Sequence, residues 1–500
     1  MGAGIAQLAC RTGAQTLLHD PLPEALERGV ERVSEGLKRE VAKGRLSAAD
    51  AAAATERLSP VGELDAFAPC ELVIEAVPER LELKHELYAR LSEEIVSAEC
   101  VLATNTSSLL VTAIAAAASH PERVVGMHFF NPAPVMRLLE VVAGEQSGAQ
   151  ALALAHATGE AMGKTVIQAS DGPGFLVNRC NRPFGLEALR LLQERLADVE
   201  TIDRICRMEG GFPMGPFELM DLVGVDTGFE ISKSFYAQSF GEPRWRPSPI
   251  AARFVAAGLH GRKTGRGYYD YGGERHRAED PPPPAPGQEQ AGGVVVIAGD
   301  GALAQQLREA AASAGFEVRS PHDPLGDALP SLQVDCAPEA DDDGPALGGA
   351  RLLLCARGSL AALDQDGGAV GFHVLPPFAD ARLVELTRTE GSSPLAAQRA
   401  ERLFAALGKH VAWVGDAPGL VLGRIVCQVI NESAFALGEG VGSAADIDRG
   451  MVLGLSHPRG PMEWAREIGI EHVLAVLDGL WAEYREERYR AAPTLRRVVA

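Results

Sequence analysis

Residues 294–304, VVVIAGDGALA, indicate the fold class of the chain. The first five of them are apolar and predict a buried β-strand, and Gly299, Gly301 and Ala304 form a GxGxxA turn at the start of a helix. Small residues at this spacing let the backbone approach a pyrophosphate at a helix N-terminus. The stretch therefore predicts a Rossmann-like, doubly wound α/β domain.

A second α/β domain is predicted at the beginning of the chain. Apolar runs at residues 16–20, 72–77, 101–104 and 124–127 predict buried strands, and helical patterns alternate with them. This alternation indicates a parallel, doubly wound sheet. Residues 23–58 carry apolar side chains at helical spacing and predict a helical arm. From Pro173 to about Gly258 the pattern is mostly helical.

The first α/β domain begins where a glycine turn would end. Gly2 occupies the place of the third small residue of the fingerprint, and Asp20 follows where a ribose-binding acid is expected. The opening strand and the first two glycines have no counterpart in the sequence. We therefore expect a start codon roughly ten residues upstream, and unpaired strand edges without it.

Two related units are indicated by a constant shift of 245 residues, which carries His128 onto His373 and Glu140 onto Glu385. The same shift relates Gly163-Lys164 to Gly408-Lys409, Asp171 to Asp416, Arg179 to Arg424, Glu187 to Glu432, and Glu218 to Glu463. One shift that holds over about 90 residues is not expected by chance, so the chain contains an internal repeat.

A proline-rich stretch, residues 272–292, separates the two units and predicts a linker without a core. The expected fold is an α/β Rossmann-like domain that lacks its first strand, then an all-α domain, then a degenerate second copy of both. The boundaries are 1–170 for the NAD-binding Rossmann-like domain, 171–271 for the helical substrate or dimerisation domain, 293–410 for the degenerate Rossmann-like domain and 411–500 for the second helical domain.

Composition excludes several classes of protein. A formal net charge of −20 argues against nucleic acid or an anionic membrane as the main partner. Eight cysteines without CxxC or zinc-type spacing predict reduced thiols, a cytoplasmic location and no metal site. No apolar run is long enough for a membrane span, so none is expected.

Six motifs carry a family resemblance: residues 1–6 (MGAGIA), 105–109 (NTSSL), 128–132 (HFFNP) with Glu140, 171–179 (DGPGFLVNR), 213–218 (PMGPFE) and 263–269 (KTGRGYY). Together they resemble the 3-hydroxyacyl-CoA dehydrogenase family, strongly up to about residue 271 and weakly over 293–500. The two-unit length resembles the bacterial branch that acts on 3-hydroxybutyryl-CoA or 3-hydroxyadipyl-CoA. The resemblance implies NAD-dependent oxidation of short 3-hydroxyacyl-CoA thioesters in fatty acid or aromatic (phenylacetate-type) catabolism.

His128 is the candidate base for the hydroxyl proton, because it follows a buried strand at the carboxyl edge where open α/β sheets bind ligands. Glu140 can hold the imidazole and stabilise its cation. Ser107 can bind the substrate oxygen, although a helix cap by it or by Ser108 is the structural alternative. Asn178 can orient the reacting groups, or serve as a capping or core hydrogen-bond partner.

The assignment of residues to the cofactor site depends mostly on the family resemblance. Asp20 favours NAD over NADP, because its carboxylate would accept from the ribose hydroxyls. By position in the family motifs, the resemblance adds Gly2, Glu79, Lys84, Asn105, Ser107, Asn131 and Lys263. Without it, Lys84 and Lys263 would be read as solvated lysines. A basic cluster of Lys38, Arg39, Lys43 and Arg45 can meet CoA phosphates, or can equally be a solvated helix face.

The second unit has lost residues of the motifs. Asn178 corresponds to Gly423, and Asn131 corresponds to Pro376. We therefore interpret His373 and Glu385 as relics, and the second unit as structural or as an internal dimer partner. The expected partners are acyl-CoA and a second copy, in a homo-oligomer or an internal pseudo-dimer through the helical domains. Two other hypotheses stay open: a non-catalytic structural or binding homologue, and a dehydrogenase of CoA-free hydroxy acids.

Overall fold

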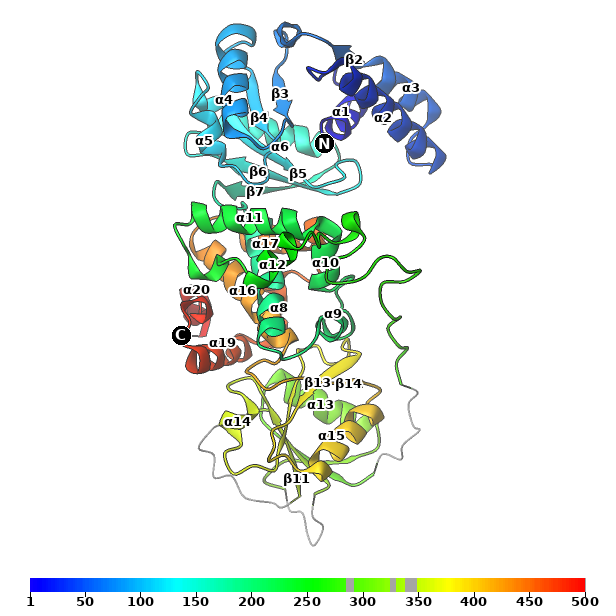
Figure 1. Ribbon diagram of the computed structural model, residues 1–500, viewed down its shortest axis with the longest axis vertical. Helices are drawn as coiled ribbons and strands as arrows, with labels where there is room; N and C mark the ends of the chain where they lie inside the picture. Colours follow the sequence, from blue (N-terminus) through cyan, green and yellow to red (C-terminus); the bar gives the residue numbers. More distant parts are fainter. Residues whose placement is uncertain (285–291, 324–329, 338–348, 500) are drawn as a thin grey trace. The chain divides into compact units, whose positions relative to one another are not determined.

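The computed structural model describes residues 1–284, 292–323, 330–337 and 349–499 (Figure 1). These residues form two compact structural units, called unit 1 and unit 2 below, whose bounds differ from those of the two sequence repeats. Unit 1 comprises Met1–Arg179 together with Glu439–Leu455, and unit 2 comprises Cys180–Gly438 together with Ser456–Ala500. Each unit is built around its own sheet.

The main sheet of unit 1 has five strands in the order β3-β4-β5-β6-β7: β3 (Leu72–Glu75), β4 (Val101–Thr104), β5 (Val124–Phe129), β6 (Leu138–Ala143) and β7 (Thr165–Ser170). The pair β5–β6 is antiparallel and the other pairs are parallel. The expectation of a wholly parallel sheet is therefore wrong at this pair, because the connection between β5 and β6 is too short for a crossover between parallel strands.

Two further strands of unit 1 form a separate ladder. β1 (Thr16–His19) pairs in parallel with β2 (Leu58–Val61), and in the described residues β3 pairs only with β4. In the seven-stranded sheet of unit 2, strand β8 lies between β9 and β10. In unit 1, β1 takes the place of β9 and β3 takes the place of β10. Within the described residues, no strand of unit 1 takes the place of β8 between them.

The helices of unit 1 are α1 (Gly2–Arg11), α2 (Pro23–Ala42), α3 (Ala48–Glu56), α4 (Leu81–Arg90), α5 (Val111–Ala115), α6 (Ala149–Ala161), α7 (Val177–Cys180) and α17 (Ala444–Leu455). The predicted helical arm is a hairpin of α2 and α3 (Figure 1). The break between them is local, because Gly44 has φ +68° and the Ser47 hydroxyl accepts from the Asp50 N–H to cap α3. α17 packs on β6 and β7.

The sheet of unit 2 has the order β14-β13-β12-β11-β10-β8-β9: β8 (Val294–Ala298), β9 (Glu317–Arg319), β10 (Leu332–Asp335), β11 (Ala350–Leu354), β12 (Val370–His373), β13 (Leu383–Thr387) and β14 (His410–Trp413). Strand β8 leads through Gly299, at φ +98°, into α13 (Ala302–Ser313), which confirms the predicted strand–turn–helix. The pair β12–β13 is antiparallel, as β5–β6 is in unit 1.

The other helices of unit 2 are α8 (Arg182–Gln193), α9 (Val199–Met208), α10 (Pro216–Val223), α11 (Val225–Gln238), α12 (Pro249–Ala256), α14 (Leu360–Leu363), α15 (Pro394–Ala406), α16 (Leu422–Gly438), α18 (Pro461–Ile468), α19 (Ile470–Tyr484) and α20 (Pro493–Val499). The central helix α16 packs against α8, α18, α19 and α20. In the described part of the chain, no helix is both long enough and apolar enough to cross a membrane. Residues 285–291 of the predicted linker lie outside the described residues.

Candidate active site

His128 and Glu140 face each other across the antiparallel pair β5–β6 of unit 1. They are register partners, and His128 Nδ1 lies 2.6 Å from Glu140 Oε2. Both side chains are buried, at 6% and 0% exposure. Because Nδ1 is engaged by the carboxylate, Nε2 is the nitrogen left for a substrate.

The Glu140 carboxylate is itself fixed by the backbone. Its Oε1 accepts from the N–H groups of Leu176 and Val177 at 3.2 and 3.0 Å. These amides are presented by the turn before α7, where Gly174 and Phe175 have φ of +73° and +51°. The Phe175 ring also lies against His128, with centroids 5.7 Å apart. The DGPGFLVNR motif therefore positions the carboxylate that holds the imidazole.

Ser107 lies in the loop after β4, and Glu79 holds it. Its N–H donates to Glu79 Oε1 at 2.7 Å, and its hydroxyl lies 3.3 Å from the same oxygen. Neither Ser107 nor Ser108 caps α5, so the capping alternative is wrong: the Asp171 carboxylate accepts from Val111 and Thr112 there.

Lys84 is not a solvated lysine. Its Nζ is buried and lies 2.9 Å from Glu75 Oε1 and 3.3 Å from Glu79 Oε2. Thr104 donates to the same Glu75 carboxylate at 2.8 Å. This ion pair joins the ends of β3 and β4 beneath the loop that carries Ser107.

The three predicted asparagines all lie in unit 1. The Asn105 Oδ1 accepts from Phe129 N–H at 2.8 Å and so ties the end of β4 to the end of β5. Asn131 is exposed in the turn after β5, and Asn178 is half-buried in α7, next to the Val177 amide that binds Glu140. The structure therefore places Ser107, His128, Glu140 and Asn178 in the same unit.

The N-terminus of α1 lies beside the ends of strands β3 and β5. A Cβ on Gly2 would lie 3.9 Å from the Ala76 Cβ, and one on Gly4 would lie 3.0 Å from the Pro134 Cδ. Asp20 directly follows β1, with its Oδ1 accepting from the Leu22 N–H at 3.0 Å. The approach is tight at Gly4, where a side chain would press on Pro134, whereas a Cβ on Gly2 would make only ordinary contact with Ala76.

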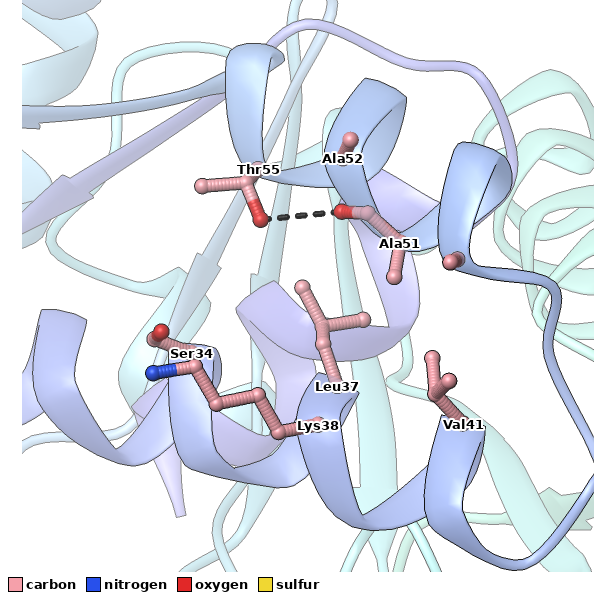
Figure 2. Close-up of a pocket in the computed structure, with 8 residues that line it drawn as sticks. Ser34, Leu37, Lys38, Val41, Ala51, Ala52 and Thr55 are labelled. Atoms are coloured by element: carbon pink, nitrogen blue, oxygen red, sulfur yellow. Dashed lines mark hydrogen bonds between the residues drawn. The ribbon is translucent and has the colours of Figure 1, made fainter.

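Lys263 lies in unit 2, where its Nζ pairs with Asp226 Oδ2 at 2.7 Å. The basic cluster lies on and after α2, with Lys38, Arg39, Lys43 and Arg45 all exposed. Lys38 also lines a pocket between α2 and α3, drawn in Figure 2 with Leu37 and Thr55.

The corresponding His–Glu pair of unit 2 has a different environment. His373 and Glu385 are register partners on β12 and β13, but His373 Nε2 lies 3.1 Å from His472 Nε2. A Cβ on Gly423 would lie 2.2 Å from His373 Cε1, so the imidazole fills the space of the missing asparagine. Burial lowers the pKa of His373 well below its usual range.

Several residues of these sites escaped the sequence analysis. Glu75, Thr104 and Thr106 hold Lys84 and Glu79 in unit 1, and Glu209 and His472 surround His373 in unit 2. Glu75 ends a predicted strand, which was a usable signal. Glu209 and His472 carried none, since they are distant in sequence from the strands they meet.

Family models match most of the chain. The model described as 3-hydroxyacyl-CoA dehydrogenase, NAD binding domain, matches residues 1–172, and the C-terminal domain model of the same family matches residues 174–271 and 419–500. The chain belongs to the 3-hydroxyacyl-CoA dehydrogenase family. It is an NAD-dependent oxidoreductase that acts on the CH–OH group of 3-hydroxyacyl-CoA.

Some relatives match this dehydrogenase over about half of the chain, and others match nearly all of it. The 3-hydroxyadipyl-CoA dehydrogenase of Escherichia coli is 36% identical over 99% of this chain and 94% of its own length. A probable 3-hydroxybutyryl-CoA dehydrogenase of Bacillus subtilis is 38% identical over 54% of this chain and 94% of its own length. A crystal structure of 3-hydroxybutyryl-CoA dehydrogenase from E. coli matches with a TM-score of 0.84 and 34% identity, over 100% of this chain and 96% of that one.

Proposed function

We propose that this dehydrogenase oxidises the 3-hydroxyl of short 3-hydroxyacyl-CoA thioesters to the 3-oxo group, with His128 as the base. The buried pair of His128 and Glu140, 2.6 Å apart, is the observation that carries the proposal. The carboxylate accepts from Nδ1–H, so the lone pair of Nε2 takes the hydroxyl proton, and the same carboxylate then stabilises the imidazolium. The two amides on Oε1 hold the Glu140 carboxyl group in place against the imidazole.

Ser107 and Asn178 are proposed to position the substrate. Glu79 holds the Ser107 backbone, and we propose that the Ser107 hydroxyl, 3.3 Å from Glu79 Oε1, turns to donate to the substrate oxygen. Asn178 directly follows Val177, whose amide binds Glu140, so its backbone is held near the pair of His128 and Glu140. Both roles are positioning roles for hydrogen bonds of about 2.7–3.1 Å to the reacting oxygen.

The residues of unit 1 fit part of an NAD site. Helix α1 begins at Gly2, and the backbone N–H groups of a helix N-terminus suit a pyrophosphate. Asp20 after β1 suits the adenine ribose, and we propose that Gly2, Glu79, Lys84, Asn105, Ser107 and Asn131 lie around the bound nucleotide. When bound, NAD supplies the nicotinamide ring that accepts the hydride. Lys263 is proposed only through the family motif, since it is paired with Asp226.

The pocket between α2 and α3 is proposed to receive part of the CoA moiety. Its wall combines apolar groups of Leu37 and Val41 with the Lys38 ammonium, as Figure 2 shows. Four exposed basic side chains lie near this pocket and can approach phosphates: Lys38, Arg39, Lys43 and Arg45. Of these, Arg45 also lies 3.7 Å from Glu40. Relatives named for 3-hydroxyadipyl-CoA and 3-hydroxybutyryl-CoA support a short acyl chain.

We also infer that residues 293–500 are a degenerate second copy, joined to the first as an internal pseudo-dimer. Two reciprocal ion pairs support this: Arg179 with Glu439 at 2.7 Å, and Arg424 with Glu194 at 2.6 Å. Adding 245 to 179 and 194 gives 424 and 439, so each pair is the image of the other. A homo-oligomer and a cytoplasmic location stay predictions; the eight free cysteines fit a reducing compartment.

An NADH absorbance assay tests the proposal. Wild type is expected to reduce acetoacetyl-CoA and not free acetoacetate, and His128→Ala is expected to lower kcat by about 10²–10⁴-fold. Equal rates with free acetoacetate would favour a dehydrogenase of CoA-free hydroxy acids. No turnover with either substrate would favour a structural homologue, and near-normal kcat in His128→Ala would refute the assigned base.

A further inference from the structure

A buried cluster in unit 2 lies outside the dehydrogenation site. Glu209 caps the C-terminus of α9, His373 ends β12 and Glu385 lies on β13. One donor atom from each of the three side chains lies within 4.8 Å of the other two. All three residues are buried. Three elements therefore bring a nitrogen and two carboxyl groups to one place in the interior.

Among the described residues, His373 Nδ1 has no hydrogen-bond partner, although its residue is 0% exposed. The carboxyl groups of Glu209 and Glu385 lie in hydrogen-bond contact with each other. In unit 1 the corresponding nitrogen, His128 Nδ1, is bonded to its glutamate. Because buried polar atoms are normally paired, His373 Nδ1 calls for a missing partner.

His472 defines what kind of partner His373 can take. The two Nε2 atoms lie 3.1 Å apart, so one of them donates and the other accepts. When His373 donates, its Nδ1 carries a lone pair beside the two carboxyl groups. A metal-bound imidazole has this arrangement, since its second ring nitrogen donates to an outer partner.

The charges of the cluster also lack compensation. Glu209 Oε1 accepts from Leu375 N–H, and Glu385 accepts from the N–H groups of Val421 and Leu422. In the described part of the chain, no lysine or arginine pairs with either carboxyl group. Two buried carboxyl groups side by side require a proton or a cation between them.

We propose that Glu209, His373 and Glu385 bind one divalent transition-metal ion, with zinc as the representative. Two carboxylate oxygens and one imidazole nitrogen form a donor set that such ions accept. Small side-chain rotations would bring the donors to the about 2.0–2.2 Å that zinc requires. The ion would be structural, since it would tie α9 to β12 and β13, and it is independent of the proposed dehydrogenase chemistry.

Unit 1 offers a matched control within the same chain. The position that corresponds to Glu209 is 209 plus 245, which is Gly454. His128 and Glu140 therefore lack the third ligand. A variant of His128 should leave the metal content unchanged, whereas variants of Glu209 and His373 should abolish it.

The test measures metal in the full-length protein, produced with added zinc and desalted. Elemental analysis of wild type and His128→Gln should give about one zinc per chain, and Glu209→Gln and His373→Gln should fall below about a tenth of that. Wild type loaded with cobalt should show a visible d–d absorption band. Zinc returned to chelator-treated protein should raise Tm by roughly 5 °C or more.

Two results would overturn the metal-binding proposal. Wild type that carries no zinc, manganese or cobalt, shows no cobalt band and keeps its Tm on metal addition would overturn the proposal and leave a proton shared by the two glutamates. Zinc at wild-type level in folded Glu209→Gln would also overturn it. If the variants do not fold, the cobalt spectrum of wild type decides the question.

Discussion

His128 and His373 show how far a repeated residue can diverge in its surroundings. Each is the register partner of a glutamate on the next strand. His128 is bonded to that glutamate, whereas His373 is bonded to His472 and has no partner at Nδ1. The repeat in the sequence was enough to predict both pairs. It could not reveal Glu209 or His472, because the contacts that bring them to His373 are made between distant helices and strands.

Glu140→Gln tests the electrostatic role of the carboxylate. The amide oxygen can still accept from Leu176 and Val177, but the amide N–H₂ then faces His128 Nδ1 and forces the proton onto Nε2. Because this tautomer cannot act as a base, kcat should fall at least about tenfold, while NADH affinity stays nearly unchanged. Stopped-flow turnover and NADH calorimetry check the split, and an unchanged kcat would show that the carboxylate only fills space.

His457 should make the protein sensitive to acid. Burial lowers the pKa of His457 to about 4, and its Nε2 donates to Asn181 Oδ1 at 2.9 Å. The folded state therefore excludes a proton that the unfolded state binds below about pH 6.5, so stability is complete above that pH and is lost as pH falls toward 4. At about pH 5 the loss from this group is of the order of 2 kcal/mol.

The matched variant for this pH dependence is His457→Gln, whose amide can still donate to Asn181. Denaturant unfolding at about pH 7.5 and pH 5 should show a smaller loss of stability in the variant than in wild type. An equal loss in both proteins would assign the acid sensitivity to other groups.

At the scale of elements, the sequence predicted strands better than the contacts that join them. The apolar runs at residues 101–104 and 124–127 are β4 and the first part of β5. Lys84 was expected either at the cofactor or in solvent, yet it is sequestered by Glu75 between β3 and β4. Helical spacing cannot show this, because the partner carboxylate lies on a strand rather than on the same helix.

Arg424 is the strongest candidate for a link between helices α8 and α16. Its guanidinium is fully buried and pairs with Glu187 at 2.9 Å and with Glu194 at 2.6 Å. Arg424→Ala would leave Glu194 without its cation and Glu187 with Arg190 alone, so it should cost about 3–5 kcal/mol of stability. The exposed pair of Arg28 and Glu24 gives the control, since Arg28→Ala should cost less than about 1 kcal/mol. Calorimetric melting of both variants tests the contrast, and similar Tm values would contradict it.

Across the whole chain, the constant shift of 245 residues also predicts which helices correspond to each other. It pairs α9 with α17, because 199 plus 245 is 444. α17 packs on β6 and β7 in unit 1, and α9 packs on β13 in unit 2. With residues 293–500 as the proposed second copy, the equivalent helices each cover a sheet of the other copy. The sequence could not predict this exchange, because a repeat fixes which segments correspond and not which copy they pack against.

The exchange leads to a prediction for the first copy alone, residues 1–292. Removing the rest of the chain removes α17, whose Gly450 and Gly454 lie so close to unit 1 that a Cβ would come within 2.6 Å of Val177 and 2.7 Å of Leu138. The apolar surface beneath this helix would then face water, and its exposure costs about 25 cal/mol of free energy per Å².

The B. subtilis relative matches one copy over 94% of its own length, so we expect a second molecule to replace the lost helix. We expect residues 1–292 to form dimers or aggregates, because α9 of another molecule can take the place of α17. Size-exclusion chromatography with light scattering measures this directly, with full-length protein as the control. A monodisperse, active monomer would show that α17 is dispensable and that the exchange of helices does not hold the first copy together.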